Sequence, residues 1–175
     1  RRLTVALCIA VAAACSPAET TAGGQSVGGG DSGRRETAIF AGGCFWSVEA
    51  NFEHMPGVVT AVSGFTGGRT RNPTYDQVVR GGTGHVEAVQ VRFDPARISY
   101  RELVDRFWLT IDPTDADGQF CDRGAAYRTA VFASAAQKPV AEASRRTAAA
   151  RLGDAGPGRC PVLACRTPSS GFRAA

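Results

Sequence analysis

The sequence predicts an α/β protein in which helices pack against a mixed sheet. Three stretches carry this prediction, because in each a strand-like run precedes a helix-like run: residues 37–55, 85–108 and 129–152. The chain has 175 residues, of which 43% are hydrophobic. That is enough for one domain with a core and too little for two, so we expect a single folded domain at residues 37–153.

The first stretch consists of a strand, a turn and a helix. Residues 37–41 are strand-like, Gly42-Gly43 forms the turn, and residues 44–55 place apolar side chains at helical spacing, namely Phe45, Val48, Phe52 and Met55. This pattern puts Cys44 at the start of the helix.

Two further strands are expected in the middle of the chain. Residues 58–63 form the first of them, followed by a glycine-rich loop at 64–73. A short helical turn at 75–79 ends near Gly81-Gly82, and residues 85–93 alternate in polarity as a strand does.

The second half adds two helices and a strand. Ser99 precedes Glu102 by three residues, which is the capping-box pattern and predicts a helix start. Residues 111–126 form a long polar loop, and loops of this length in a compact domain are usually functional or disordered. A strand at 129–133 and a helix at 135–152 complete the domain.

Both ends of the chain are predicted to lie outside the domain. Residues 1–14 join two arginines to a short apolar run, which is typical of a secretory signal and too short to span a bilayer. Cys15 follows three alanines, as in the lipobox of bacterial lipoproteins. We expect export to the periplasm or the membrane of a bacterial envelope, with a lipid on Cys15 as the attachment.

Residues 15–36 are rich in small and polar residues and are expected to be a flexible linker. At the other end, residues 154–175 have no periodicity and contain several Gly and Pro residues. We expect an irregular tail there, as a frameshifted or truncated gene model would produce.

Charge and cysteine spacing exclude two classes of partner. The net charge is +4, but residues 37–155 carry 13 Lys+Arg against 13 Asp+Glu, so the domain has no basic footprint for nucleic acid. None of the six cysteines is spaced with another, or with either histidine, as in a zinc site. We expect no metal and no nucleic acid.

Cys44 is the first candidate for chemistry. At a strand-to-helix junction, unpaired backbone N–H groups and the helix dipole favour a thiolate, which is the reactive form of cysteine. The alternative is that Cys44 is a small buried hydrophobic residue, as most unpaired cysteines are.

Glu87 is the second candidate. It shares a strand face with apolar residues, namely Val89, Val91 and Phe93. A carboxyl group on such a face is desolvated, which raises its pKa and suits it to donate a proton. The alternative is a carboxylate that remains in water at the strand end.

The third candidate is the loop that carries Gln119, Asp122 and Tyr127. Loops held by rigid elements commonly bear binding groups. Asp and Gly are also ordinary turn residues, which leaves a purely structural interpretation open.

Taken together, five segments resemble the peptide methionine sulfoxide reductase A family. In chain order they read GGCFW at 42–46 with Glu49, NPTY at 72–75, GTGHVE at 82–87, DPT at 112–114 and QFCDRGAAY at 119–127. The resemblance runs from about Thr37 to Phe132 and implies the two-layer arrangement of that family.

The resemblance also implies a reaction and roles for seven residues. Cys44 would attack the sulfoxide sulfur and become a sulfenic acid, while Glu87 would protonate the oxygen. Tyr75 and Tyr127 would donate hydrogen bonds to the oxygen. Phe45 and Trp46 would form the aromatic wall around the methyl group, and Asp122 would help to shape the pocket. The implied substrates are oxidised proteins and free methionine sulfoxide, in the S epimer, with no metal or organic cofactor.

The residues that would regenerate the Cys44 thiol differ from the pattern of the family. Many relatives carry Cys where this chain has Ser47, so a disulfide must form elsewhere. Cys121 is the first choice of resolving thiol, Cys160 and Cys165 match only loosely, and an external thiol is the third route. Electrons would come from thioredoxin or another dithiol donor.

Two other functions remain open at this point. The chain could be an impaired lipoprotein remnant that binds oxidised or thioether side chains, because relatives usually end in an aromatic and acidic segment that residues 156–175 do not resemble. It could also be a thiol peroxidase, since an activated cysteine reacts with peroxide as well.

Overall fold

The structure is a computed structural model that describes residues 33–152, 162–164 and 171–175. The expected signal, the lipid attachment at Cys15 and nearly all of the expected linker lie outside these residues. Among the described helices, none combines the length and the apolar character that crossing a bilayer requires.

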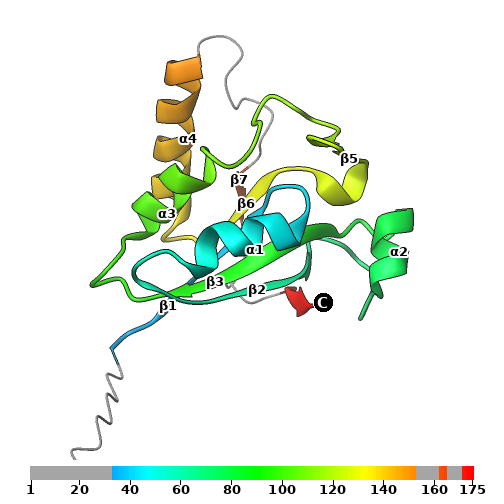
Figure 1. Cartoon of the computed structure of the whole chain (residues 1–175), viewed down its shortest axis with the longest axis horizontal. Helices are drawn as coiled ribbons and strands as arrows, with labels where there is room; N and C mark the ends of the chain where they lie inside the picture. The colour runs from blue at the N-terminus through cyan, green and yellow to red at the C-terminus, as the bar shows by residue number, and fades with distance from the viewer. Residues whose placement is uncertain (1–32, 153–161, 165–170) are drawn as a thin grey trace, which may run out of the picture. The chain divides into compact units, whose positions relative to one another are not determined.

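A six-stranded sheet forms the centre of the fold (Figure 1). Its strand order is β7-β6-β1-β3-β2-β8, and the strands are β1 (Glu36–Ala41), β2 (Val58–Thr66), β3 (Val86–Phe93), β6 (Ala130–Ala133), β7 (Val162–Ala164) and β8 (Arg173–Ala174). Neighbouring strands are antiparallel except β6 and β7, which are parallel. The predicted mixed sheet is therefore confirmed.

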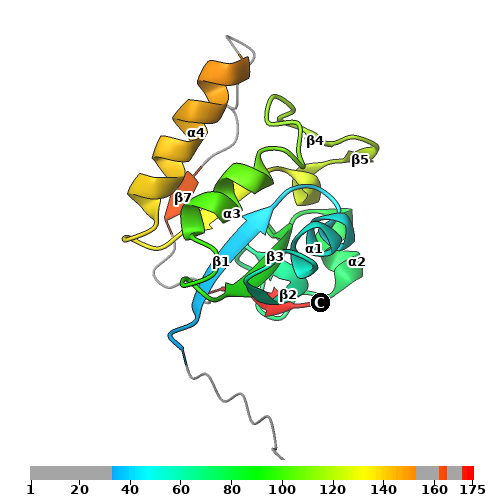
Figure 2. The same cartoon turned by 60° about the vertical axis from the view of Figure 1, so that its left-hand side comes forward.

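Three helices pack on one face of the sheet and make the second layer (Figure 2). They are α1 (Phe45–Glu53), α3 (Tyr100–Phe107) and α4 (Lys138–Leu152), whereas the short α2 (Tyr75–Arg80) lies at the side. Buried residues of these three helices join one core cluster with alternate residues of β1, β3 and β6. The two-layer arrangement implied by the resemblance is thus present.

Strand alternation divides the buried residues between the two faces of the sheet. Towards the helices, the ring of Phe40 stacks on Phe52 and Phe107 at centroid distances of 4.9 and 5.0 Å. The opposite face carries a smaller cluster with four members on β1 and β6 and others on β3 and near β8, namely Ile39, Ala41, Ala130, Phe132, Ala88 and Phe172. Residues along β1 therefore contribute to both clusters in turn.

Most expected elements are present, with shifted ends. Ser99 and Glu102 form both bonds of the capping box at the start of α3, as the spacing predicts. β2 extends three residues beyond its predicted end because Phe65 and Thr66 still pair with β3. The last helix begins at Lys138 rather than residue 135, since Ser134 to Gln137 form a hydrogen-bonded turn before it.

The long polar loop has more structure than the sequence predicts. It contains a small hairpin of β4 (Gly118–Gln119) and β5 (Asp122–Arg123), followed by the helical turn η1 (Ala125–Tyr127). Strands of two residues leave no periodicity in a sequence, so pattern analysis cannot find them.

The C-terminal segment also differs from the irregular tail expected at residues 154–175. β7 pairs with β6 and β8 pairs with β2, at opposite edges of the sheet. Both strands are too short to show alternation, and their partners are distant in sequence. Residues 153–161 and 165–170, including Cys160 and Cys165, lie outside the described part.

Candidate active site

Cys44 is the N-cap of α1, directly after the turn that follows β1. Two glycines make this turn possible. A Cβ on Gly42 would lie 2.9 Å from Ile111 and 3.0 Å from Phe107, and Gly43 has a φ of +86° with Gln119 at 2.6 Å from a Cβ placed there. The backbone before Cys44 is thus packed against Ile111 and Phe107 at Gly42 and against Gln119 at Gly43. Cys44 itself is half-buried.

Glu87 lies on the helix-facing side of β3 and is 1% exposed. Its Oε2 accepts a hydrogen bond of 3.0 Å from the N–H of Phe45, the residue after Cys44, and its Oε1 is buried without a partner in the described structure. Burial raises the pKa of Glu87, the Phe45 N–H opposes this, and the charge of Asp122 adds to the rise. Of the two sequence alternatives, the structure has the desolvated carboxyl.

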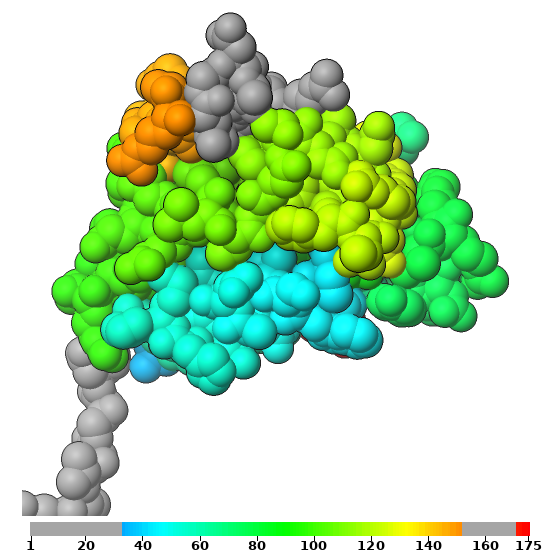
Figure 3. All heavy atoms as spheres, turned by 45° about the horizontal axis from the view of Figure 1, so that its top comes forward, coloured from blue at the N-terminus to red at the C-terminus, as the bar shows by residue number. Residues whose placement is uncertain are grey.

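Two phenols and a second carboxylate surround Glu87. Burial raises the pKa of Tyr127 to about 12, and Glu87, Tyr75 and Asp122 act in the same direction. Such effects require these groups to be near one another, so three separate segments meet here. Figure 3 shows the start of α1, the segment around η1 and α2 side by side on one face.

An aromatic cluster borders these polar groups. The buried ring of Phe45 lies 5.6 Å from Trp46, 5.7 Å from Phe65 and 6.2 Å from Tyr75, measured between centroids. Trp46 is 67% exposed, so its ring is open to a ligand. This is an apolar seat beside a proton donor.

Sequence analysis missed Phe65. It falls in the segment expected to be a glycine-rich loop, but it pairs with Glu87 across β2 and β3 and is buried against Phe45. The only local signal is the apolar residue itself. Its position in the site follows from strand register, which a single sequence does not reveal.

Gln119 has a structural role rather than an exposed binding role. It is 1% exposed, its Nε2 donates to the carbonyls of Asp112 and Gly118, and its Oε1 accepts from the Asp112 N–H, each at 2.7 Å. The side chain therefore fastens the β4–β5 hairpin while its Cβ lies against Gly43.

Cys121 lies at the tip of this hairpin, next to Asp122. It is exposed and is not in a disulfide. Its neighbour Phe120 is also exposed and has a φ of +52°. The structure thus places the predicted resolving thiol on the loop that also carries a site carboxylate.

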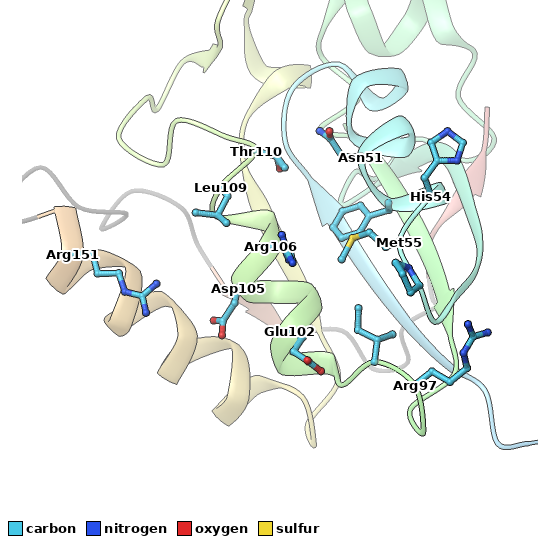
Figure 4. A pocket seen from close by; sticks show the side chains of 13 residues that line it. Asn51, His54, Met55, Arg97, Glu102, Asp105, Arg106, Leu109, Thr110 and Arg151 are labelled. Atoms are coloured by element: carbon cyan, nitrogen blue, oxygen red, sulfur yellow. The ribbon is translucent and has the colours of Figure 1, made fainter.

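A hollow of about 670 Å³ lies elsewhere on the domain (Figure 4). The end of α1, the turn after it and α3 line this hollow, with Met55, Arg106 and Leu109 among the side chains. None of the sequence-predicted site residues borders it. We therefore locate the candidate site at Cys44 and Glu87 on chemical grounds.

Within residues 33–152, 162–164 and 171–175, no three His, Cys, Asp or Glu side chains are grouped as metal ligands. The groups that do converge are a thiol, a buried carboxyl, two phenols and an aromatic seat. This set suits thiol chemistry on a small polar group that carries an apolar substituent.

Comparison with known proteins agrees with this class. The family profile described as peptide methionine sulfoxide reductase matches residues 36–154. Peptide methionine sulfoxide reductase MsrA 2 of Caulobacter vibrioides is 54% identical over 119 residues, which cover 68% of this chain and 61% of that protein.

Solved structures share the fold. Methionine sulfoxide reductase A of Corynebacterium diphtheriae is similar with a TM-score of 0.71 and 35% identity, covering 83% of this chain and 71% of that one. Mxr1 of Saccharomyces cerevisiae in complex with Trx2 has a TM-score of 0.51 and 20% identity, covering 81% of each chain.

The chain belongs to the peptide methionine sulfoxide reductase A family. It spans 61% of the length of its Caulobacter relative. The family recognised from the five sequence segments is therefore confirmed.

Proposed function

We propose that this protein reduces the S epimer of methionine sulfoxide, free or within oxidised proteins, to methionine. The observation that carries the proposal is the bond from the Phe45 N–H to Glu87, because it holds a buried carboxyl group beside the residue that follows Cys44. The family membership of residues 36–154 supports the same reaction.

The first half of the reaction uses Cys44 and Glu87. The Cys44 sulfur attacks the sulfoxide sulfur while the protonated Glu87 gives its proton to the sulfoxide oxygen. The attack joins the two sulfur atoms. The oxygen, as hydroxyl, then passes with its bonding electron pair from the methionine sulfur to the Cys44 sulfur, and the sulfur–sulfur bond breaks with its electron pair left on methionine. Cys44 is oxidised by two electrons to a sulfenic acid, and methionine is released reduced by two electrons. The hydroxyls of Tyr75 and Tyr127 bind the oxygen, and Asp122 shapes the pocket.

Substrate binding falls to the aromatic cluster. Phe45 and the exposed Trp46 receive the methyl group of the sulfoxide, because an apolar substituent gains free energy when it leaves water. The aromatic cluster borders the polar groups around Glu87, so the methyl group and the oxygen of one sulfoxide each have a partner there.

In the second half, the thiol is restored. We propose that Cys121 attacks the sulfenic acid, forming a Cys44–Cys121 disulfide and releasing water. A thioredoxin-like dithiol then reduces the disulfide and is itself oxidised. Cys121 is exposed at the hairpin tip, which supports its role as the resolving thiol. The structurally similar Mxr1 has been solved in complex with Trx2, which supports a thioredoxin-like donor.

We further propose that the protein acts in the bacterial envelope. The support is the sequence of residues 1–15 alone, with its charged start, apolar run and Cys15. Mass spectrometry of the mature protein tests this proposal. A diacylglyceryl group on an N-terminal Cys15 is expected, and an uncleaved chain retained in the cytoplasm contradicts it.

The reaction is tested by single-turnover reduction of each epimer of a methionine sulfoxide peptide by pre-reduced protein without added thiol. We expect about one methionine per chain from the S epimer and none from the R epimer. Mass spectrometry should find a Cys44–Cys121 disulfide, and Cys121→Ser should leave a sulfenic acid that dimedone traps. A double Cys160→Ser, Cys165→Ser variant is the matched control and should keep the disulfide.

Other outcomes identify the rival functions. Binding of the sulfoxide without any methionine formed would show an impaired remnant. Faster consumption of peroxide than of sulfoxide would show a thiol peroxidase, and a disulfide to Cys160 or Cys165 would move the resolving role to the tail.

A further inference from the structure

Tyr75 is held in the site by few contacts of its own helix. α2 has six residues, and Val78 is the one that is buried. Tyr75 itself is 44% exposed. Its ring contacts Phe45 and Phe65, and its backbone is held by the segment that leads from β2 into α2.

His85 anchors the first part of that segment. The residue is 6% exposed, and its Nε2 lies 2.9 Å from the carbonyl oxygen of Thr70. A carbonyl only accepts, so Nε2 carries the hydrogen, and Nδ1 is buried without a partner in the described structure. A Cβ on Gly68 would overlap the imidazole ring, so the chain passes directly over it.

Backbone bonds reinforce the same anchor. The His85 N–H donates to the Thr83 hydroxyl at 3.2 Å, and the Arg69 N–H donates to the Thr83 carbonyl at 3.1 Å. The segment from Arg69 onwards is thereby tied to the residues just before β3, the strand that carries Glu87.

A capping box anchors the other end. Thr74 and Gln77 bond to each other's backbone N–H groups, at 2.9 and 3.3 Å. Only three residues separate Thr70 from Thr74, and Asn72 among them has a φ of +48°. Tyr75 follows the second anchor directly, so little freedom remains between the His85 ring and Tyr75.

We propose that His85 is a positioning residue that holds the Tyr75 hydroxyl at the site through its hydrogen bond to Thr70. The effect on catalysis rests on the proposed sulfoxide reduction. The effect on the position of Tyr75 does not, and it can be measured separately.

Two substitutions separate the hydrogen bond from the bulk of the ring. In His85→Gln the side-chain amide reaches the position of Nε2 and can donate to Thr70, whereas the shorter Asn does not. We expect kcat/KM for the S sulfoxide to fall at least about tenfold in His85→Asn and less than about threefold in His85→Gln.

A double-mutant cycle tests whether the effect passes through Tyr75. In a Tyr75→Phe background, His85→Asn should cost less than about twofold, because the hydroxyl that it positions is already gone. An equal loss in both backgrounds would mean that His85 acts on the fold in general, and the proposal would be wrong.

A spectroscopic readout needs no activity. The chain has three tyrosines, at positions 75, 100 and 127, so fluorotyrosine labelling gives three ¹⁹F resonances, which Tyr75→Phe and Tyr100→Phe assign. His85→Asn should shift or broaden the Tyr75 resonance and leave that of Tyr100 in place. Gly68→Ala keeps the histidine, but its methyl group would overlap both the ring and the backbone nitrogen of His85. It should displace the same anchor and have the same effect on the Tyr75 resonance.

An unmoved Tyr75 resonance in both variants would overturn the proposal. If His85→Asn fails to fold, Gly68→Ala and His85→Gln still decide it. An inactive wild-type protein with the expected ¹⁹F shifts would count against the proposed function and not against the anchor.

Discussion

At the scale of single residues, the site is built around a thiol at a helix start and a carboxyl group kept out of water. Cys44 caps α1, and the first N–H of that helix bonds to Glu87. One helix terminus thus carries the thiol and donates the hydrogen bond that holds the proton donor. Substituting either residue should have distinct consequences.

Cys44 should be the most reactive thiol of the described residues. Cys44 lies at the start of α1 beside the buried Glu87, whereas Cys121 is on an exposed hairpin turn. We expect iodoacetamide to alkylate Cys44 faster than Cys121, Cys160 and Cys165 at neutral pH, and Cys44→Ser to abolish turnover. Equal alkylation rates, followed by peptide mass mapping, would argue against an activated thiolate.

Glu87→Gln should remove the proton donor but keep the bond to the Phe45 N–H through its amide oxygen. We expect kcat to fall by about 100-fold or more, as for the loss of a general acid. In the wild type, activity should fall as the pH rises through the raised pKa of Glu87, because the carboxyl group loses its proton. A wild-type profile that stays flat over the same range would contradict this role.

The same substitution tests the electrostatics of the fold. Because burial raises the pKa of Glu87 above 4.5, the folded state keeps a proton that the unfolded chain has released. Stability from this group is therefore complete below pH 4.5 and is lost as the pH rises to the folded-state pKa. Urea titrations should show Glu87→Gln gaining stability relative to the wild type over that window.

At the scale of elements, the strand-to-helix turn and the β4–β5 hairpin form one unit. Gly43 leaves room for the Cβ of Gln119, and the Gln119 amide fastens the hairpin that carries Asp122. The turn before the nucleophile and the site loop therefore share one packing contact, which explains why position 43 needs a glycine.

Gly43→Ala should disturb both sides of this contact. An L-residue at a φ of +86° costs about 1–2 kcal/mol, and the new methyl group would overlap Gln119. We expect a loss of at least about 2 kcal/mol in the free energy of unfolding, with a lower kcat. Ser99→Ala, which removes the cap of α3 far from the turn, should cost about 1 kcal/mol and leave kcat unchanged.

At the scale of the whole molecule, Phe172 near the C-terminus packs against one face of the sheet. Phe172, 9% exposed, packs with residues of β1, β3 and β6 on the face away from the helices, and β8 pairs with β2. The segment around β8 is thus part of the fold rather than an appendage.

Phe172→Ala should therefore destabilise the whole domain. We expect a loss of about 3 kcal/mol in the free energy of unfolding, as for other buried phenylalanines. Arg173→Ala, an exposed neighbour, is the control and should change stability by less than about 0.5 kcal/mol. Equal denaturation midpoints for wild type and Phe172→Ala would show that this segment does not stabilise the domain.

Long periodic elements could be predicted from the sequence, whereas short pairings could not. The helices α1 and α3 and the strands β1 and β3 follow from spacing and caps, which are local properties. β4, β5, β7 and β8 have two or three residues each, too few to show alternation, and β7 and β8 also depend on partners distant in sequence. The same distinction applies to the site, where Phe65 was missed although Phe45 was found.

By itself, the sequence determined the family, the mixed α/β architecture, and the position of Cys44 and Glu87 on their elements. These follow from local order along the chain and from the five segments that resemble known reductases. The tertiary structure decided what surrounds these two residues. Glu87 is buried and accepts a hydrogen bond from the Phe45 N–H, and it interacts electrostatically with Tyr127 and Asp122, while Tyr75 acts on Tyr127. Burial and charge coupling are sums over neighbours from separate segments, so only the folded chain defines them.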